Sequence, residues 1–140
     1  ENVSGITGLS KAMDVAYREL DEHRMRIEGL KSYMIEELKK TIPGVAFNGL
    51  SAEMDKSLYT VLSVMFPPTD MGEMLLYNLD IMGIACSGGS ACSSGSNVGS
   101  HVLRGIGIDM TRPSLRFSFS KYNTKEEIDY VINQLQSLFN

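Results

Sequence analysis

The sequence has few cysteines, no long apolar run and no excess of positive charge, and each absence excludes a class of protein. Two cysteines in 140 residues are too few for a disulfide scaffold, which favours a reducing, cytoplasmic location. No apolar run approaches the ~18 residues of a membrane span, so no membrane role is expected. With a net charge of −4, the chain has no excess of basic residues, so we do not expect it to bind nucleic acid.

The beginning of the chain also lacks familiar signals. The first residues have neither the basic start nor the apolar core of a secretory signal, and the chain begins with Glu1 instead of methionine. A chain of 140 residues is long enough for one domain with a core. We therefore expect a single domain over residues 1–140 that is a piece of a longer protein.

The hydrophobic pattern predicts a mixture of helices and strands. Apolar residues recur every three or four positions from Ile6 to Leu38, which predicts one long helix that ends at Pro43 and Gly44. The other expected elements are strands at Val45–Phe47, Ser57–Phe66, Gly83–Ser87 and Ser114–Ser120, and helices from Thr69 or Asp70 to Met82, from Ser100, and after Thr124. The order αββαβαβα predicts an α+β fold, with helices packed on one face of a mostly antiparallel sheet.

Both cysteines lie in or beside a segment rich in glycine and serine. Ten of the fourteen residues from Ser87 to Ser100 are Gly or Ser, a composition typical of flexible linkers. Cys92 lies inside this segment, where little apolar surface could bury it, and it is either an incidental thiol or a reactive one. Cys86 follows an apolar strand and is interpreted as a structural core residue.

Arg116 is the only charged residue in the alternating stretch "SLRFSFS", Ser114–Ser120. Its strand would place Ser114 and Ser118 on the same polar face. A guanidinium held on a rigid strand beside hydroxyls suits bidentate binding of a carboxylate. The alternative is an arginine on an edge strand that only faces solvent.

Other kinds of site have little support in the sequence. His23 and His101 lie far apart, and neither has metal-ligand spacing with a cysteine, so no metal site is expected. The glycine-rich segment lacks the Gly-Lys-Ser/Thr ending of a phosphate-binding loop.

Four stretches together resemble one enzyme family. The stretch "SGGSACSSGS", Ser87–Ser96, resembles the active-site cysteine loop of the pyridoxal-phosphate cysteine desulfurases, which belong to the class V aminotransferases. "SHVLRGIGI" resembles the helix that follows this loop, and "PSLRFSFSKYNTKEEID" the strand with a carboxylate-binding arginine and the final helix. "ENVSGITGLSKAMDVA" resembles the start of the family's C-terminal domain. The resemblance therefore covers essentially the whole chain, in order.

The resemblance implies specific roles and a fold. Cys92 aligns with the nucleophile that attacks the sulfur of a cysteine–pyridoxal adduct and becomes a persulfide, and Arg116 aligns with the arginine that binds the substrate carboxylate. The mobile active-site loop that it implies comprises Ser87, Gly88, Gly89, Ser90, Ala91, Ser93, Ser94, Gly95 and Ser96. The implied fold is the small C-terminal domain of a fold-type I, aminotransferase-like enzyme.

The family also implies components that this chain does not carry. None of its lysines matches the motif of the lysine that binds pyridoxal phosphate, so we expect no cofactor in this fragment and no activity from it alone. The full-length enzyme would be a homodimer that uses L-cysteine and passes sulfur to an acceptor or iron–sulfur scaffold protein. A selenocysteine lyase, another class V aminotransferase-like enzyme and a non-enzymatic sulfur-relay module are the alternatives.

Overall fold

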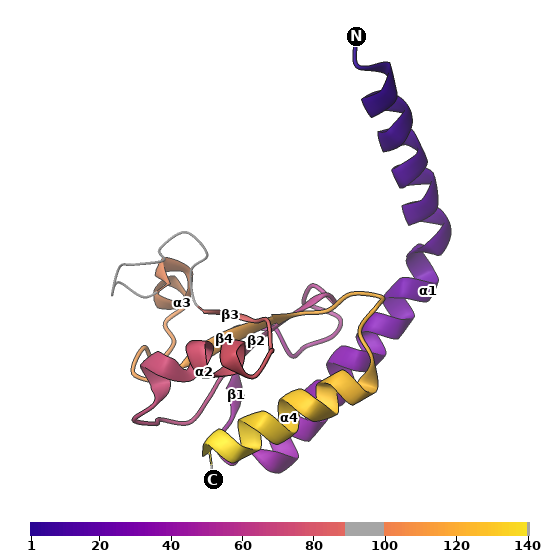
Figure 1. The fold of residues 1–140 in the computed structure, drawn as a ribbon. Helices are drawn as coiled ribbons and strands as arrows, with labels where there is room; N and C mark the ends of the chain where they lie inside the picture. The colour runs from indigo at the N-terminus through magenta and orange to yellow at the C-terminus, as the bar shows by residue number, and fades with distance from the viewer. Residues whose placement is uncertain (89–99, 140) are drawn as a thin grey trace.

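The computed structural model describes residues 1–88 and 100–139. Helices and strands are mixed along the chain (Figure 1). The elements are α1 (Val3–Thr41), β1 (Ala46–Phe47), β2 (Val61–Met65), the 3₁₀-helix η1 (Gly72–Met74), α2 (Leu75–Ile81), β3 (Ser87–Gly88), α3 (His101–Gly105), β4 (Ser114–Ser118) and α4 (Lys125–Phe139). Among the described residues, no helix is both long enough and apolar enough to cross a membrane.

The four strands form one sheet in the order β1-β2-β4-β3. Each neighbouring pair is antiparallel, which confirms the expectation of a mixed fold with an antiparallel sheet. β2 and β4 pair along their whole length, from Val61 opposite Ser118 to Met65 opposite Ser114. β4 is therefore a central strand, and a residue in its middle is held from both sides.

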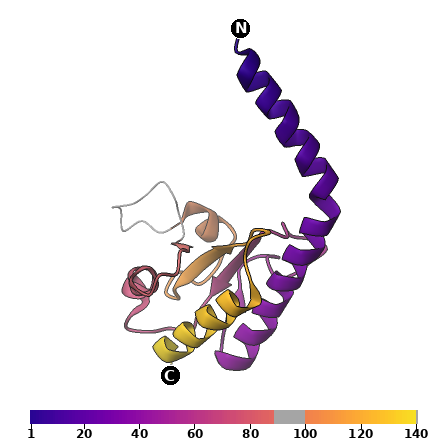
Figure 2. The same cartoon turned by 45° about the vertical axis from the view of Figure 1, so that its right-hand side comes forward.

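One face of the sheet forms the core. Leu62 and Val64 of β2 and Leu115 and Phe117 of β4 are buried, because residues two apart on a strand point to the same face. α4 lies beside the C-terminal half of α1, and the two helices cover this face (Figure 2). They contribute Ile27, Met34, Ile35, Leu38, Ile128, Ile132 and Leu135 to the core.

The two halves of α1 have different surroundings. The helix begins at Asn2, whose side chain accepts the Gly5 N–H at 2.9 Å, and it ends before Pro43. Its N-terminal half projects beyond the sheet (Figures 1 and 2). The apolar side chains on this half are exposed, namely Val3, Ile6, Leu9, Met13 and Leu20. The apolar stripe predicted from the sequence is therefore packed only in its second half.

Three expectations about the remaining elements need correction. α3 lies over the face of the sheet opposite α1 and α4, so the helices do not all pack on one face. The predicted helix from Thr69 or Asp70 begins later, as η1 and then α2, after a turn in which Thr69 Oγ1 accepts the Met71 N–H. The strand predicted at Gly83–Ser87 is displaced along the chain, and its described part is Ser87–Gly88.

Candidate active site

The outer face of β4 carries the candidate site. β4 buries Leu115 and Phe117 and presents Arg116 and Ser118 to the other side, as its alternation predicts. The Arg116 side chain is exposed. Among the side chains that the structure describes, no carboxylate forms an ion pair with it. Its guanidinium can therefore receive an external anion.

Arg116 lies in the middle of a row of three polar residues that crosses the sheet. Ser63 of β2 is its register partner on one side, and Ser87 of β3 is its partner on the other. The guanidinium Nη2 donates a hydrogen bond to Ser87 Oγ at 3.2 Å. Because both neighbours belong to paired strands, the base of the Arg116 side chain has a fixed position.

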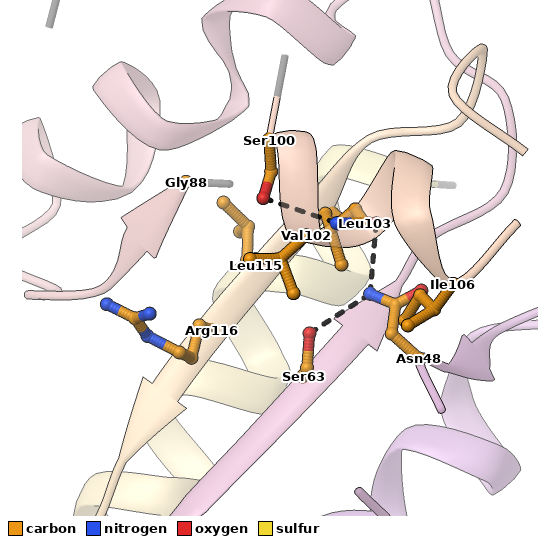
Figure 3. Close-up of a pocket in the computed structure, with 10 residues that line it drawn as sticks. Asn48, Ser63, Gly88, Ser100, Val102, Leu103, Ile106, Leu115 and Arg116 are labelled. Carbon is orange, nitrogen blue, oxygen red and sulfur yellow. Dashed lines mark hydrogen bonds between the residues drawn. The ribbon is translucent and has the colours of Figure 1, made fainter. Parts of the chain in front are cut away.

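A pocket of about 270 Å³ lies between this face and α3 (Figure 3). Ser63, Ser114 and Arg116 form part of its floor. Val102 of α3 and Ile106, the residue that follows α3, lie over them. The N-terminus of α3 is capped by Ser100, a buried residue whose Oγ accepts the Leu103 N–H at 3.3 Å. The side of the pocket formed by the sheet is thus polar, and Val102 and Ile106 make the opposite side apolar.

Asn48 forms the inner end of the pocket. It is 4% exposed, and its Nδ2 donates to Ser63 Oγ at 3.0 Å and Ser114 Oγ at 3.2 Å (Figure 3). These bonds tie the residues after β1 to both central strands. Its Oδ1 is buried and has no hydrogen-bond partner among the described residues. The hydroxyl of Ser63 is therefore engaged with Asn48, whereas Ser87 contacts the guanidinium.

Cys86 is half-buried and packs against the core. Burial, with a smaller contribution from Asp80, raises the pKa of its thiol to about 11. The thiolate is the nucleophilic form of cysteine, so the raised pKa disfavours the reactive form of Cys86 at neutral pH. The position agrees with the structural role that the sequence indicates for Cys86.

Comparison with known proteins connects this site to a family. The sequence model of the aminotransferase class-V family matches residues 1–131. The chain belongs to the aminotransferase class-V family. The match includes both cysteines and Arg116, so the candidate site lies within the shared part of the family's sequence.

Class V relatives include proteins named as cysteine desulfurases. The chain is 37% identical to "Cysteine desulfurase IscS" of Dictyoglomus turgidum over 99% of its own length, and 38% identical to the protein of that name from Clostridium botulinum. It spans about a third of the length of these relatives, 34% and 35% respectively. Their names therefore describe proteins much longer than this chain.

Solved class V structures share the fold. A "NIFS-LIKE PROTEIN" superposes with a TM-score of 0.74 at 32% identity, covering 98% of this chain and 33% of that protein. A NifS-like protein from Rickettsia africae superposes with a TM-score of 0.73 at 26% identity, covering 99% of this chain and 35% of that one. The aminotransferase-like fold implied by the sequence resemblance is thereby confirmed.

Only part of the cysteine loop lies within the described residues. Ser87 and Gly88, which the resemblance assigns to the loop, form β3 and pair with Arg116 and Leu115. They belong to a strand because the ladder with β4 satisfies their backbone groups. Cys92 and the other loop residues lie outside the described residues, namely Gly89, Ser90, Ala91, Ser93, Ser94, Gly95 and Ser96. The structure thus does not test their predicted roles.

The described lysines do not form a site for pyridoxal phosphate, the cofactor that the family implies. Such a site needs a lysine amine that is free to bond the cofactor's carbonyl carbon. Lys31 is fully buried, but its Nζ donates to Ser57 Oγ at 2.8 Å and to the Leu58 carbonyl at 2.9 Å. Several other lysines form ion pairs at the surface, namely Lys11, Lys40, Lys56 and Lys121. Lys39 and Lys125 lie over the rings of Phe47 and Tyr33. No described lysine lines the pocket beside Arg116, so the cofactor does not fit this pocket.

Sequence reasoning missed Lys31 and Asn48. Lys31 lies on the buried side of α1, four residues after Ile27 and three before Met34. That spacing was the available signal. Asn48 precedes Gly49 in a turn sequence, and its contacts with two distant strands have no local signal. No group of three metal-ligating side chains occurs among the residues described.

Proposed function

We propose that this chain is the C-terminal small domain of a pyridoxal-phosphate-dependent cysteine desulfurase. The full-length protein would convert L-cysteine to L-alanine and carry the sulfur as a persulfide on Cys92. One observation carries the proposal. In a chain 37% identical to a cysteine desulfurase, Arg116 is held beside Ser87, five positions before Cys92.

Arg116 would bind the carboxylate of L-cysteine. Its guanidinium is exposed, pairs with no described carboxylate and is anchored on a central strand. An arginine offers donors in a planar fork that matches the two oxygens of a carboxylate. Binding at this end of the substrate would leave the sulfur-bearing carbon free of contact with the guanidinium. Arg116 would therefore orient the substrate and take no part in bond breaking.

Cys92 would accept the sulfur. Its thiolate would attack the sulfur atom of the substrate, so that an S–S bond forms as the C–S bond breaks. The electron pair of the C–S bond and a proton then complete L-alanine, and the enzyme holds a persulfide. The half-buried position of Cys86 and the raised pKa of its thiol support Cys92 as the nucleophile of the two cysteines.

The remaining components belong to the full-length protein. Pyridoxal phosphate would be held by residues outside this chain and would make the C–S bond labile. The fragment alone would therefore be inactive. The full-length protein would act in the cytoplasm as a homodimer and would deliver sulfur to an acceptor or scaffold protein of iron–sulfur cluster assembly.

The test measures alanine formation from L-cysteine by the full-length protein with its cofactor. The wild-type protein should form alanine, Cys86→Ser should retain that activity, and Cys92→Ser should lose it. Unchanged activity in Cys92→Ser would contradict the proposed nucleophile. Turnover of L-selenocysteine that survives in Cys92→Ser, without turnover of L-cysteine, would favour a selenocysteine lyase. No alanine formation at all would favour a sulfur-relay module.

A further inference from the structure

We infer that Ser87 is a positioning residue, which holds the Arg116 guanidinium in the orientation that receives the substrate carboxylate. The inference rests on the proposed function, because it assigns Arg116 to carboxylate binding. It adds a role for a residue in β3 that the resemblance treats only as part of a loop.

The register of the sheet brings the two side chains together. Ser87 and Arg116 are directly opposite each other in the antiparallel β3–β4 pair. Residues in such a pair project to the same face of a sheet with their Cβ atoms about 5 Å apart. Ser87 Oγ accepts the hydrogen bond from Arg116 Nη2 at 3.2 Å. Strand pairing therefore brings the two side chains within reach of each other.

The residues around Arg116 offer no equivalent second contact. Ser63, its partner on the other side, has its hydroxyl engaged by Asn48 Nδ2 at 3.0 Å. Among the described residues, the bond to Ser87 is the one side-chain hydrogen bond of the guanidinium. Figure 3 shows the guanidinium directed away from Asn48. The orientation of Arg116 thus depends on β3.

The bond to Ser87 orders the Arg116 side chain before the substrate binds. A free arginine side chain loses conformational entropy when it becomes ordered. A contact that orders it before the substrate arrives reduces the part of this loss that falls on substrate binding. The bond to Ser87 uses one of the five N–H groups and leaves the others for a carboxylate. The serine hydroxyl also retains its own proton, which it can donate to a carboxylate oxygen.

The test compares three variants of the full-length protein with its cofactor. Ser87→Ala removes the hydroxyl, Ser87→Thr retains one, and Ser118→Ala removes an exposed hydroxyl two residues from Arg116 on the same face of β4. Loss of one hydrogen bond of this kind corresponds to about a 2- to 10-fold effect. We expect Ser87→Ala to raise KM for L-cysteine by that factor with kcat within about 2-fold, and Ser87→Thr to restore most of the loss.

A ligand comparison separates positioning from a structural effect. The probes are L-alanine, which has a free carboxylate, and L-alanine methyl ester, which does not. We expect Ser87→Ala to weaken competitive inhibition by L-alanine about 2- to 10-fold and to leave inhibition by the ester unchanged. An equal loss for both probes would show a general structural effect and overturn the inference. If Ser87→Ala proves unfolded by circular dichroism, the same comparison is made with Ser87→Cys.

Arg116→Ala distinguishes failure of this inference from failure of the proposed function. In one outcome, Arg116→Ala weakens inhibition by L-alanine and not by the ester, while Ser87→Ala behaves like Ser118→Ala. In that case the role of Ser87 is wrong and the carboxylate site stands. If Arg116→Ala itself leaves inhibition by L-alanine unchanged, the carboxylate site is wrong and the role of Ser87 is overturned with it.

Discussion

The two faces of the sheet are built from the same strands but differ in polarity and in their expected roles. The inner face of β2 and β4 is apolar and lies under α1 and α4, and its side chains are almost entirely enclosed. The outer face carries Ser63, Arg116 and Ser87 in a row, below a short helix, α3, that has no buried residue. Stability should therefore depend on the inner face, and substrate binding on the outer face.

The largest expected effect comes from opening a cavity on the inner face. Leu62 is fully buried at the centre of β2, so Leu62→Ala should lower the free energy of unfolding by about 2–5 kcal/mol. Ser118→Ala, on the exposed face of β4, should change it by less than about 0.5 kcal/mol. Urea unfolding of the two variants measures the difference, and similar losses would break the contrast between the faces.

The second prediction concerns function on the outer face. Arg116→Ala in the full-length protein should lower kcat/KM for L-cysteine by about 10- to 100-fold, since a charge-assisted hydrogen bond contributes about 1.5–3 kcal/mol. Its unfolding midpoint should remain close to that of the wild type, because the side chain is exposed. A large loss of stability with unchanged kcat/KM would contradict the proposal that the outer face serves substrate binding and the inner face stability.

A third prediction concerns the charged group that lies on the apolar side. Burial lowers the pKa of Lys31 below the 10.5 of an exposed lysine, so the unfolded chain binds the proton more tightly. Stability should therefore rise with pH between the lowered pKa and 10.5. Lys31→Met should lack this rise, and unfolding curves of both proteins across that range provide the measurement. Parallel pH profiles would show that Lys31 does not titrate as its burial predicts.

The smallest expected effect tests the contact between the two helices over the inner face. The hydrogen bond from Tyr33 to Asp129 joins α1 to α4 and raises the pKa of Tyr33 to about 12. The stabilisation by this bond is complete below pH 10 and should be lost as pH rises towards 12. Tyr33→Phe removes this hydrogen bond and should abolish its pH-dependent stabilisation. The difference between the wild-type and variant unfolding midpoints should therefore shrink as pH rises from 10 towards 12. A difference that stays constant with pH would contradict the assignment.

Local features of the fold could be predicted from the sequence. The alternation in "SLRFSFS" correctly separates buried Leu115 and Phe117 from exposed Arg116. The helix expected after Thr124 is also confirmed. It begins with a capping box, in which Thr124 Oγ1 accepts the Glu127 N–H and Glu127 accepts the Thr124 N–H. Both signals lie within a few residues, where periodicity and capping chemistry act directly.

Features that depend on distant residues could not be predicted. The row Ser63–Arg116–Ser87 depends on the register of three strands, and sequence alternation does not determine which residues lie opposite one another. The position of α3 over the outer face follows from packing and has no local signal. Periodicity also could not show that the apolar side chains of the first half of α1, such as Ile6 and Leu9, are exposed. It identifies an apolar stripe and does not identify what covers it.

The most direct test locates the sulfur after reaction. The full-length protein with its cofactor is incubated with L-cysteine, and fragment-ion mass spectrometry then identifies which cysteine carries an additional sulfur atom. Our account predicts the persulfide on Cys92 and none on Cys86, whose thiol is half-buried and has a raised pKa. Alanine that accumulates while Cys92 remains unmodified, or a persulfide found on Cys86, would contradict it.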